Sequence, residues 1–556
     1  MLPPEYFDTA ADDILELYTQ LDQTILRDIV RRLVKTGGMT DTAIWQAQRL
    51  QDSGLLMQDI IREVAQMSSA SDARVKALFE DAGVQAMQTD FSIYEAAGLS
   101  PLPLRQAPAA AAVLQAGVSK TAGHLRNLTM TTATATQQAY IRAVTLAEMQ
   151  VESGAFNYVT AIRNAVRSAV QAGTMVQYPT GWKDQLDVAI RRATLTGVSQ
   201  TAAQLSLKYA DDMDCDLVET TAHAGARPSH QLWQGRVFSR SGQRGRYPDF
   251  VSSTHYGSGD GLCGWNCRHS FFPYYEGLSA SVYPRERISE YNNRTVEYNG
   301  QTVSYYDATQ AQRAMERRIR ATKRELAGYA EGMQSDDEAV RNALREDFNA
   351  SSVTLKQQEA KLRDFTRQTG LDRQNEREQV LGFGKSPAQS ARQAAEKHYR
   401  QWTHGIGADD AAPKTLAKYY QEKYNNSPAH ELLVGYNKAV EKGDISPLVG
   451  LQQYTQTGRE AEQNIVGVTT ANGVKIESYV THFIDRLIGQ TSTPHAGMRT
   501  GVPVADAKDA LVNPFRIGKA HTMADGDVRQ TFYGKRATVS VSIRDKRLIQ
   551  ANPRRE

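Results

Sequence analysis

The stretch GLCGWNCRHSFFPYYEG at residues 261–277, with HAGARPSHQLWQG at residues 223–235 before it, differs in composition from the rest of the chain. The two stretches hold two of the three cysteines and two of the five tryptophans, with histidines beside them. Short β-like runs such as DLVETTA and RVFSR surround them. We therefore expect a small, irregular α+β domain here, inside a chain that is otherwise polar and helical.

The spacing of the cysteines and histidines fits a metal site. Zinc is held tetrahedrally by Cys and neutral His, and ligand pairs have roughly two to four residues between them on a tight turn. Cys263-Gly-Trp-Asn-Cys267 has this spacing, and Gly264 would relieve the turn. The sequence offers a structural zinc site of His223, His230, Cys263 and Cys267, with His255 and His269 as further candidate ligands.

A second interpretation needs no metal. The two cysteines, Trp233 and Trp265 would be buried packing in a small domain, and hydrogen-bonded histidines would fix its loops. A nucleophilic role for Cys267 is the weakest reading, because no recognisable local signature surrounds it. The residues leave the choice between zinc and plain packing open.

In the rest of the chain, apolar residues recur at three- and four-residue steps over 12–36, 134–173 and 183–210, which predicts amphipathic helices. We expect one helix to end near Gln51, before Ser53-Gly54, and another to follow in LLMQDIIREVAQM. Asn299-Gly300 in TVEYNGQTVSYY predicts a hairpin with a type I′ turn. The densely charged stretch 307–364 predicts a solvated helical hairpin.

The fold class predicted from this order is multidomain, with mainly α N-terminal and central regions and two small α+β domains. The first of these is the irregular Cys/His domain and the second is C-terminal. The expected segments are helical regions over 1–100 and 101–213, a Cys/His-containing core with a β-hairpin over 214–306, a charged helical region over 307–385, a connector over 386–470 and an α+β domain over 471–556.

Composition excludes several classes of protein. The 65 basic and 62 acidic residues leave a formal net charge of +3, so any nucleic-acid binding must come from a local patch. Three cysteines in 556 residues argue against a disulfide framework and for synthesis in a reducing compartment. We expect no signal peptide in MLPPEYFDTAADDILELY, and no run of about 18 apolar residues suggests a membrane span.

TAHAGARPSHQLWQG and GLCGWNCRHSFFPYYEG resemble the signature of the phage minor capsid protein 2 family, which is related to the Mu-type and SPP1-type minor head morphogenesis proteins. YPTGWKDQLDVAIRRATLTGVSQT upstream and VEYNGQTVSYYDATQAQRAMERRIRATKRE and VLGFGKS downstream extend the resemblance over roughly residues 1–385. The signature positions that it supports are His223, Arg227, His230, Trp233, Gly235, Cys267, Arg268 and His269.

This resemblance implies a low-copy component of the virion. Such a protein is made in the host cytoplasm, associates with portal, capsid or scaffold proteins during head morphogenesis, and is packaged with the phage DNA. The resemblance does not decide whether the Cys/His signature binds metal.

The last 86 residues carry 14 Lys/Arg and 8 Asp/Glu, a difference of +6. Helical patterns over 476–489 and 503–511 precede three strands, RQTFY, RATVSVSI and RLIQANP. The order resembles the phage-associated tails of the barnase, EndoU, colicin and RelE-like nucleases. This resemblance implies a toxin-like ribonuclease that acts on RNA without metal.

Attack by a 2′-hydroxyl needs a base, an acid and cations near the phosphate. His482 and Arg486 share one helix face, and His495 and Arg499 repeat their spacing. We expect His482 and His495 as the base and acid, and Arg486 and Arg499 as phosphate contacts. Arg529, Tyr533, Lys535 and Thr538 would line the groove. The alternative is a structural head protein whose C-terminal domain only binds nucleic acid.

Overall fold

A computed structural model describes residues 1–35, 42–443, 445, 447–490, 499–524 and 526–554, and these form two compact units. Unit 1 comprises residues 1–391 and unit 2 comprises residues 392–556. The helix α12 (Lys385–Gly405) contains the boundary between them.

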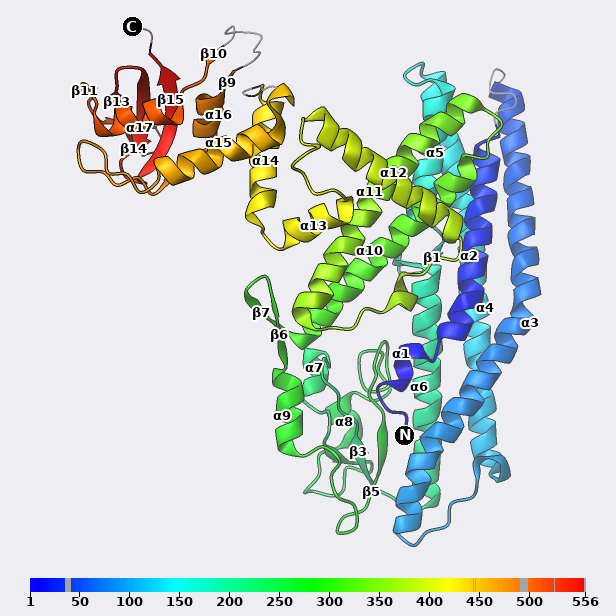
Figure 1. Ribbon diagram of the computed structural model, residues 1–556. Helices are drawn as coiled ribbons and strands as arrows, with labels where there is room; N and C mark the ends of the chain where they lie inside the picture. The colour runs from blue at the N-terminus through cyan, green and yellow to red at the C-terminus, as the bar shows by residue number, and fades with distance from the viewer. Residues whose placement is uncertain (36–41, 444, 446, 491–498, 525, 555–556) are drawn as a thin grey trace. The chain divides into compact units, whose positions relative to one another are not determined.

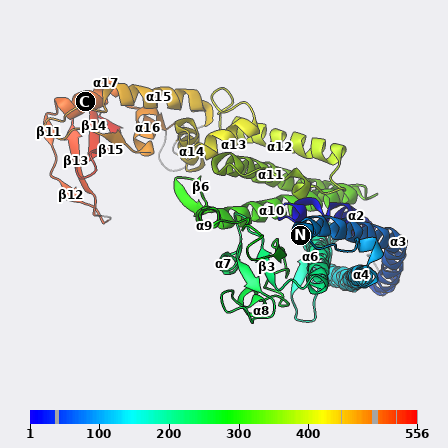
Figure 2. The same cartoon turned by 90° about the horizontal axis from the view of Figure 1, so that it is seen from below.

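Unit 1 is built on long helices that lie side by side (Figures 1 and 2). Their apolar faces share one core with α10 and α11, which form the predicted charged helical hairpin. The elements of this scaffold are α1 (Tyr6–Thr9), α2 (Asp12–Leu33), α3 (Thr42–Ala96), η1 (Leu104–Gln106), α4 (Pro108–Glu152), α5 (Tyr158–Ala172), β1 (Met175–Gln177), β2 (Lys183–Gln185), α6 (Leu186–Asp212), α10 (Tyr305–Gly332), α11 (Glu338–Thr369) and η2 (Asn375–Glu378).

The expected helix end before Ser53-Gly54 is wrong, because α3 continues through both residues. A glycine inside a helix costs about 1 kcal/mol relative to alanine. Packing outweighs this cost, since Ser53 is buried and Leu56 and Ile60 in the next turn enter the core. Local propensity alone therefore misplaced this boundary.

A buried ion pair joins three helices of unit 1. Arg324 of α10 donates from Nε to Asp22 of α2 at 3.1 Å, and its Nη2 lies 3.8 Å from Asp187 of α6. The side chains of Arg324 and Asp22 are 6 % and 5 % exposed. Gln185 accepts a further hydrogen bond from Arg324 at 2.9 Å, and Thr174 donates to Asp22. The guanidinium of Arg324 and the carboxylate of Asp22 thus each have more than one polar partner.

The predicted irregular α+β domain follows directly from α6. A three-stranded antiparallel sheet, ordered β4-β3-β5, is surrounded by loops and short helices. Asn299 and Gly300 have φ values of 51° and 72°, which confirms the predicted turn of the hairpin. The elements are β3 (Leu217–Thr220), α7 (Pro228–Gln231), β4 (Val237–Ser239), α8 (Phe250–Thr254), β5 (Phe271–Tyr274), α9 (Arg285–Asn293), β6 (Thr295–Tyr298) and β7 (Gln301–Ser304).

Unit 2 contains the predicted C-terminal α+β fold. Its sheet has the order β11-β13-β14-β15-β8, with β12 also paired to β13, and helices cover one face. The described part of residues 386–470, expected as a connector, contains the α-helices α12 to α15 and the 3-10 helix η3, and α14 and α15 share the core of the sheet. The elements are α13 (Leu416–Tyr424), α14 (Pro428–Glu441), η3 (Pro447–Val449), α15 (Gly450–Asn464), β8 (Ser478–Tyr479), α16 (Thr481–Ile488), β9 (Gly489–Gln490), β10 (Arg499–Thr500), α17 (Val504–Val512), β11 (Arg516–Ile517), β12 (His521–Thr522), β13 (Val528–Tyr533), β14 (Ala537–Ser542) and β15 (Arg547–Pro553).

Within the described residues, no helix combines the length and the apolar composition needed to cross a bilayer.

The buried ion pair yields a test of the scaffold. Arg324→Leu leaves the Asp22 carboxylate buried without its cation, whereas Asp187 keeps Arg320 at 3.1 Å, so we expect the free energy of unfolding to fall by about 3–5 kcal/mol. Arg31→Leu is the matched control. Arg31 also joins α2 to α10, through Glu331, but its side chain is 62 % exposed, so we expect a loss of at most about 1 kcal/mol. Urea unfolding followed by circular dichroism measures both. Equal losses in the two variants would contradict the role given to Arg324.

Candidate metal centre and nucleic-acid interface

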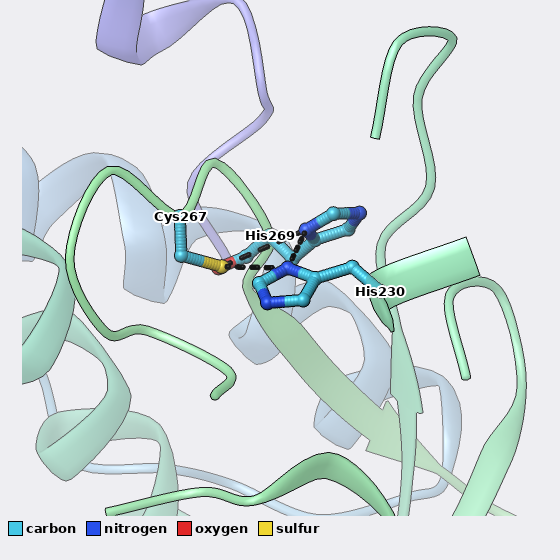
Figure 3. Close-up of side chains that lie close together, drawn as sticks. All are labelled: His230, Cys267 and His269. Atoms are coloured by element: carbon cyan, nitrogen blue, oxygen red, sulfur yellow. Dashed lines mark hydrogen bonds between the residues drawn. The ribbon is translucent and has the colours of Figure 1, made fainter. Parts of the chain in front are cut away.

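Three ligand-capable side chains converge in the core of the irregular domain (Figure 3). His230 comes from α7, Cys267 from the turn after α8, and His269 from the segment that enters β5. The distance between the two Nδ1 atoms is 3.4 Å, and Cys267 Sγ lies 3.7 Å from that of His230 and 3.6 Å from that of His269. Their exposed fractions are 2 %, 6 % and 1 % in chain order. The cluster is therefore small and shielded from solvent.

The outer nitrogens of both imidazoles are held by oxygen acceptors. His230 Nε2 lies 2.8 Å from the carbonyl oxygen of Asp260, and His269 Nε2 lies 3.0 Å from Oε1 of Gln234. Trp233 packs against both rings, with centroid distances of 4.5 Å to His230 and 4.8 Å to His269. These contacts fix the orientation of each ring.

Burial sets the protonation of the cluster. It lowers the pKa of His230 to about 4, although the hydrogen bond to the Asp260 carbonyl acts in the opposite direction. Burial also lowers the pKa of His269 far below its ordinary value, with a further contribution from the neighbouring histidines. The pKa of the Cys267 thiol is raised by the same burial. Without a bound cation the three groups are neutral at pH 7.

The turn that carries Cys267 needs unusual backbone geometry. Cys263 and Asn266 have φ values of 58° and 54°, in the left-handed region that side chains other than glycine rarely adopt. A Cβ on Gly261 would lie 1.9 Å from the carbonyl oxygen of His255, and one on Gly264 would lie 2.4 Å from that of Gly259. The chain is folded back on itself here, and this fold places Cys267 against the histidines.

The other predicted ligands lie around the cluster. His223 stacks on His269 at a centroid distance of 4.5 Å, and its Nδ1 bonds to the carbonyl oxygen of Ala224. Cys263 is buried, and its thiol donates to the carbonyl oxygen of His269 at 3.6 Å. His255 is exposed at the end of α8. Of the four residues first expected to bind zinc, the structure thus brings His230 and Cys267 together, with His269 as the third member.

The packing interpretation was wrong for one aromatic residue. Trp233 is buried, as expected, but Trp265 is 61 % exposed. The Trp265 backbone, rather than its ring, has the structural role, because its N–H donates to Gly259 and its carbonyl oxygen accepts from Arg227 at 2.7 Å.

The signature residues Gly235 and Arg268 have structural roles. Gly235 has a φ of 65°, and a Cβ there would lie 2.2 Å from Cδ1 of Ile288. Arg268 forms an ion pair with Asp8 of α1, and burial lowers its pKa to about 10. The domain is therefore fastened to the N-terminal segment of unit 1.

In unit 2, the structure brings two of the predicted catalytic residues together on α16. Arg486 donates from Nε to His482 Nε2 at 3.0 Å, and His482 Nδ1 lies 3.8 Å from the buried carboxylate of Asp485. Burial raises the pKa of Tyr454, and the carboxylate of Asp485 adds to the shift. His482 is about one-third exposed, so one edge of its ring remains open to solvent.

Tyr533 and Thr538 lie apart from this pair. They are cross-strand neighbours on β13 and β14. On β14, Ala537 and Val539 are buried in the core that also contains Phe483 of α16, so Thr538 between them points to the opposite face of the sheet. The register of β13 places Tyr533 on that same face. His495 lies outside the described residues, and Arg499 begins the strand β10 opposite Gln490.

The sheet face opposite the helices is polar. Its described strand positions carry no carboxylate, but Asp527 and Asp545 beside the strands pair with Arg529 and Arg547 of this face at 2.8 and 3.1 Å. Cross-strand register gives three rows of side chains that share this face. The outer rows carry cations and the middle row carries hydroxyl and amide groups. The rows are Arg516, Tyr533, Thr538 and Asn552; Thr531, Ser540 and Gln550; and His521, Arg529, Ser542 and Arg547.

One end of this face combines cations with aromatic rings. The Arg516 guanidinium lies 4.9 Å from the centroid of Tyr533, and that of Arg554 lies 4.1 Å from the centroid of Phe515. Lys535 is exposed in the adjoining turn between β13 and β14. Sequence reasoning had missed Arg516, Phe515, Arg554 and His521, although alternation along the predicted strands was a signal for part of this face.

The family model for phage minor capsid protein 2 matches residues 2–367, more than half of the 556 residues. The match includes the long-helix scaffold as far as Arg367 of α11, and the whole irregular domain with its Cys/His cluster. The chain therefore belongs to the phage minor capsid protein 2 family, and membership makes it a structural protein of the phage virion. No curated protein and no solved structure matches the chain.

The folded-back turn gives a local test. A Cβ at Gly261 overlaps a backbone carbonyl that cannot move aside, so we expect Gly261→Ala to lower the free energy of unfolding by about 1–3 kcal/mol. Gly245→Ala in the same domain is the control, because nothing lies within 4 Å of its added Cβ and its φ is ordinary. Urea titration followed by tryptophan fluorescence compares them. An unchanged midpoint for Gly261→Ala would show that the turn is not rigid.

Proposed function

We propose that this minor capsid protein attaches to portal, capsid or scaffold proteins through unit 1 and contacts packaged DNA through the open sheet face of unit 2. The observation that carries the DNA-binding half is the end of the face where Arg516 and Arg554 lie against the aromatic rings of Tyr533 and Phe515. Phosphates are attracted by such a surface, and exposed rings stack on bases.

Support for attachment through unit 1 comes from its surface. Met130, Ile141 and Met149 of α4 are 41 %, 39 % and 61 % exposed. At 3.6 residues per turn they fall within about 100° of the helix circumference. We infer that this side of α4 is the contact surface for another protein.

A second candidate function is RNA cleavage at His482. The observation that favours it is the arrangement of Asp485, His482 and Arg486, in which a carboxylate lies beside one ring nitrogen and a guanidinium bonds to the other. The lone pair of His482 Nε2 accepts from Arg486 in this arrangement, so exchange of a proton with a 2′-hydroxyl requires Arg486 to turn from the ring to the phosphate. In this case RNA is the substrate, and its path would have to reach the helical side of the sheet.

The attachment is tested by truncation at the unit boundary. We expect a chain that ends at Ala391 to be incorporated into heads at the level of the full chain, because it keeps the whole family-matched region. A chain that ends at Thr470 is a poorer design, since it exposes the core residues Leu433, Tyr436 and Tyr454. Immunoblotting of purified virions measures incorporation. Loss of the truncated chain from virions would place the attachment surface in unit 2.

The open sheet face is tested in the full chain with single-stranded DNA and RNA at several salt concentrations. We expect the double variant Arg516→Ser and Arg554→Ser to weaken binding and to reduce the salt dependence by about two phosphate contacts. A control with the same change in charge, Lys508→Ser and Lys546→Ser, alters exposed positions outside the rows of this face. Equal weakening by both pairs would show that only net charge matters.

The same samples, incubated with total RNA in EDTA, test the second candidate. If His482→Ala abolishes cleavage and His521→Ala retains it, the cleavage site lies on α16. Intact RNA, together with binding that depends on Arg516 and Arg554, is the result expected for a domain that only binds.

A further inference from the structure

The geometry of His230, Cys267 and His269 matches three corners of a metal tetrahedron. With Zn–N of about 2.0–2.1 Å and Zn–S of about 2.3 Å, tetrahedral ligands lie about 3.3–3.4 Å apart for two nitrogens and about 3.6 Å apart for nitrogen and sulfur. The observed distances are 3.4 Å between the nitrogens and 3.6 and 3.7 Å to the sulfur. The three atoms thus need almost no rearrangement to bind one ion.

The hydrogen bonds around the cluster fix which nitrogen of His269 carries its proton. The backbone N–H of His223 donates to Gln234 Oε1 at 3.0 Å, and Gln234 Nε2 donates to Asn292. This pair of contacts identifies Oε1 as the oxygen of the amide. His269 Nε2 must therefore donate to it, which leaves Nδ1 of the neutral ring with a bare lone pair.

The same reasoning applies to His230. Its Nε2 lies 2.8 Å from the carbonyl oxygen of Asp260, which can only accept. The proton of the neutral ring is therefore on Nε2, and Nδ1 again has a bare lone pair. The two lone pairs face each other at 3.4 Å in the buried core.

The protein itself provides few hydrogen-bond donors to these two lone pairs. The Cys267 thiol has one proton, which can satisfy one of the two nitrogens but not both. A second proton would create a buried imidazolium, and within the described chain no carboxylate accepts a hydrogen bond from any of the three side chains. A bound cation satisfies both lone pairs and the sulfur at once.

We propose that His230 Nδ1, Cys267 Sγ and His269 Nδ1 bind a zinc-class divalent ion that stabilises the irregular domain. Binding releases the Cys267 proton, and the resulting thiolate balances part of the metal charge. Nitrogen and sulfur ligands in a tetrahedral arrangement favour zinc over magnesium or calcium. The Asp260 carbonyl and the Gln234 amide are the partners that orient the two imidazoles.

This ion would hold together three segments that have little regular structure. It joins α7, the turn at 263–267 and the entry to β5, in a domain whose apolar core is much smaller than that of the helical scaffold. Small cores are commonly reinforced by a structural metal. The site differs from the set first expected, since His269 replaces His223. Cys263, whose thiol bonds to the His269 carbonyl, is the neighbouring cysteine that could close the fourth position by rotation.

The experiment measures metal in the purified full chain by mass spectrometry. We expect one equivalent of zinc in the wild type, and loss of zinc in His230→Ala, Cys267→Ser and His269→Ala. His255→Asn and Cys215→Ser are matched controls, because they remove a histidine and a cysteine that lie outside the cluster, and both should retain the ion. Retention in His223→Ala would further separate the proposed set from the one first expected.

A second measurement covers variants that fail to fold. Wild-type chain stripped with a chelator is titrated with Co²⁺, and the visible spectrum is expected to show tetrahedral coordination with a thiolate band. Zinc should then displace the cobalt and raise the Tm of the stripped chain. A weaker thiolate band in Cys263→Ser would indicate a second sulfur ligand, and an unchanged intensity would indicate Cys267 alone. The proposal would be overturned if the purified wild-type chain contains no metal, does not bind Co²⁺ and shows no rise in Tm with zinc.

Discussion

The buried contact of Arg324 with Asp22 and Asp187 is the constraint on which the rest of unit 1 depends. It ties α10 to α2 and α6 in a place where an unpaired charge would cost several kcal/mol. Because α6 leads directly into β3, the helix fixed by this contact also sets the position of the irregular domain. Its opposite side is held by the ion pair between Arg268 and Asp8 and by the hydrogen bond from Ser270 to the carbonyl oxygen of Leu2. The Cys/His cluster therefore lies between two points of attachment to the scaffold.

The chemistry of the Cys/His cluster differs from that of a catalytic site. Its three ligand atoms are shielded from solvent, and the pKa values of both histidines are lowered by burial rather than by a partner that would activate them. A general base must remain within reach of its substrate, and the exposed neighbours Trp265 and His255 lie outside the cluster. The geometry fits a role in holding segments together, which suits a protein whose family is structural.

Much of the fold could be predicted because periodicity and turn chemistry are local. The Asn299-Gly300 hairpin, the charged helices α10 and α11 and the strands β13 to β15 all follow from short-range patterns. The failures have a common physical origin in tertiary contact. Gly54 stayed helical because neighbouring turns are buried. His269 joined the cluster because β3 and β5 pair, which no spacing in the sequence records. The expected catalytic and groove residues were chosen by their spacing and order along the chain. Neither helix nor strand periodicity could show that α16 lies on the opposite face of the sheet from Thr538.

The family match covers most of unit 1 but none of unit 2, and this bears on which unit carries which function. The family match ends at residue 367, shortly before unit 1 ends at residue 391, whereas α14 and α15 share their core with the sheet of unit 2. A segment that evolves as an exchangeable tail must carry its own core, and unit 2 meets this condition only when the helices before residue 471 are included. The cations of its open face then belong to a unit that has its own core and lies outside the family-matched residues. If unit 2 contacts nucleic acid as proposed, a change of nucleic-acid partner, or of binding into cleavage, would require no change in the residues that form the core of unit 1.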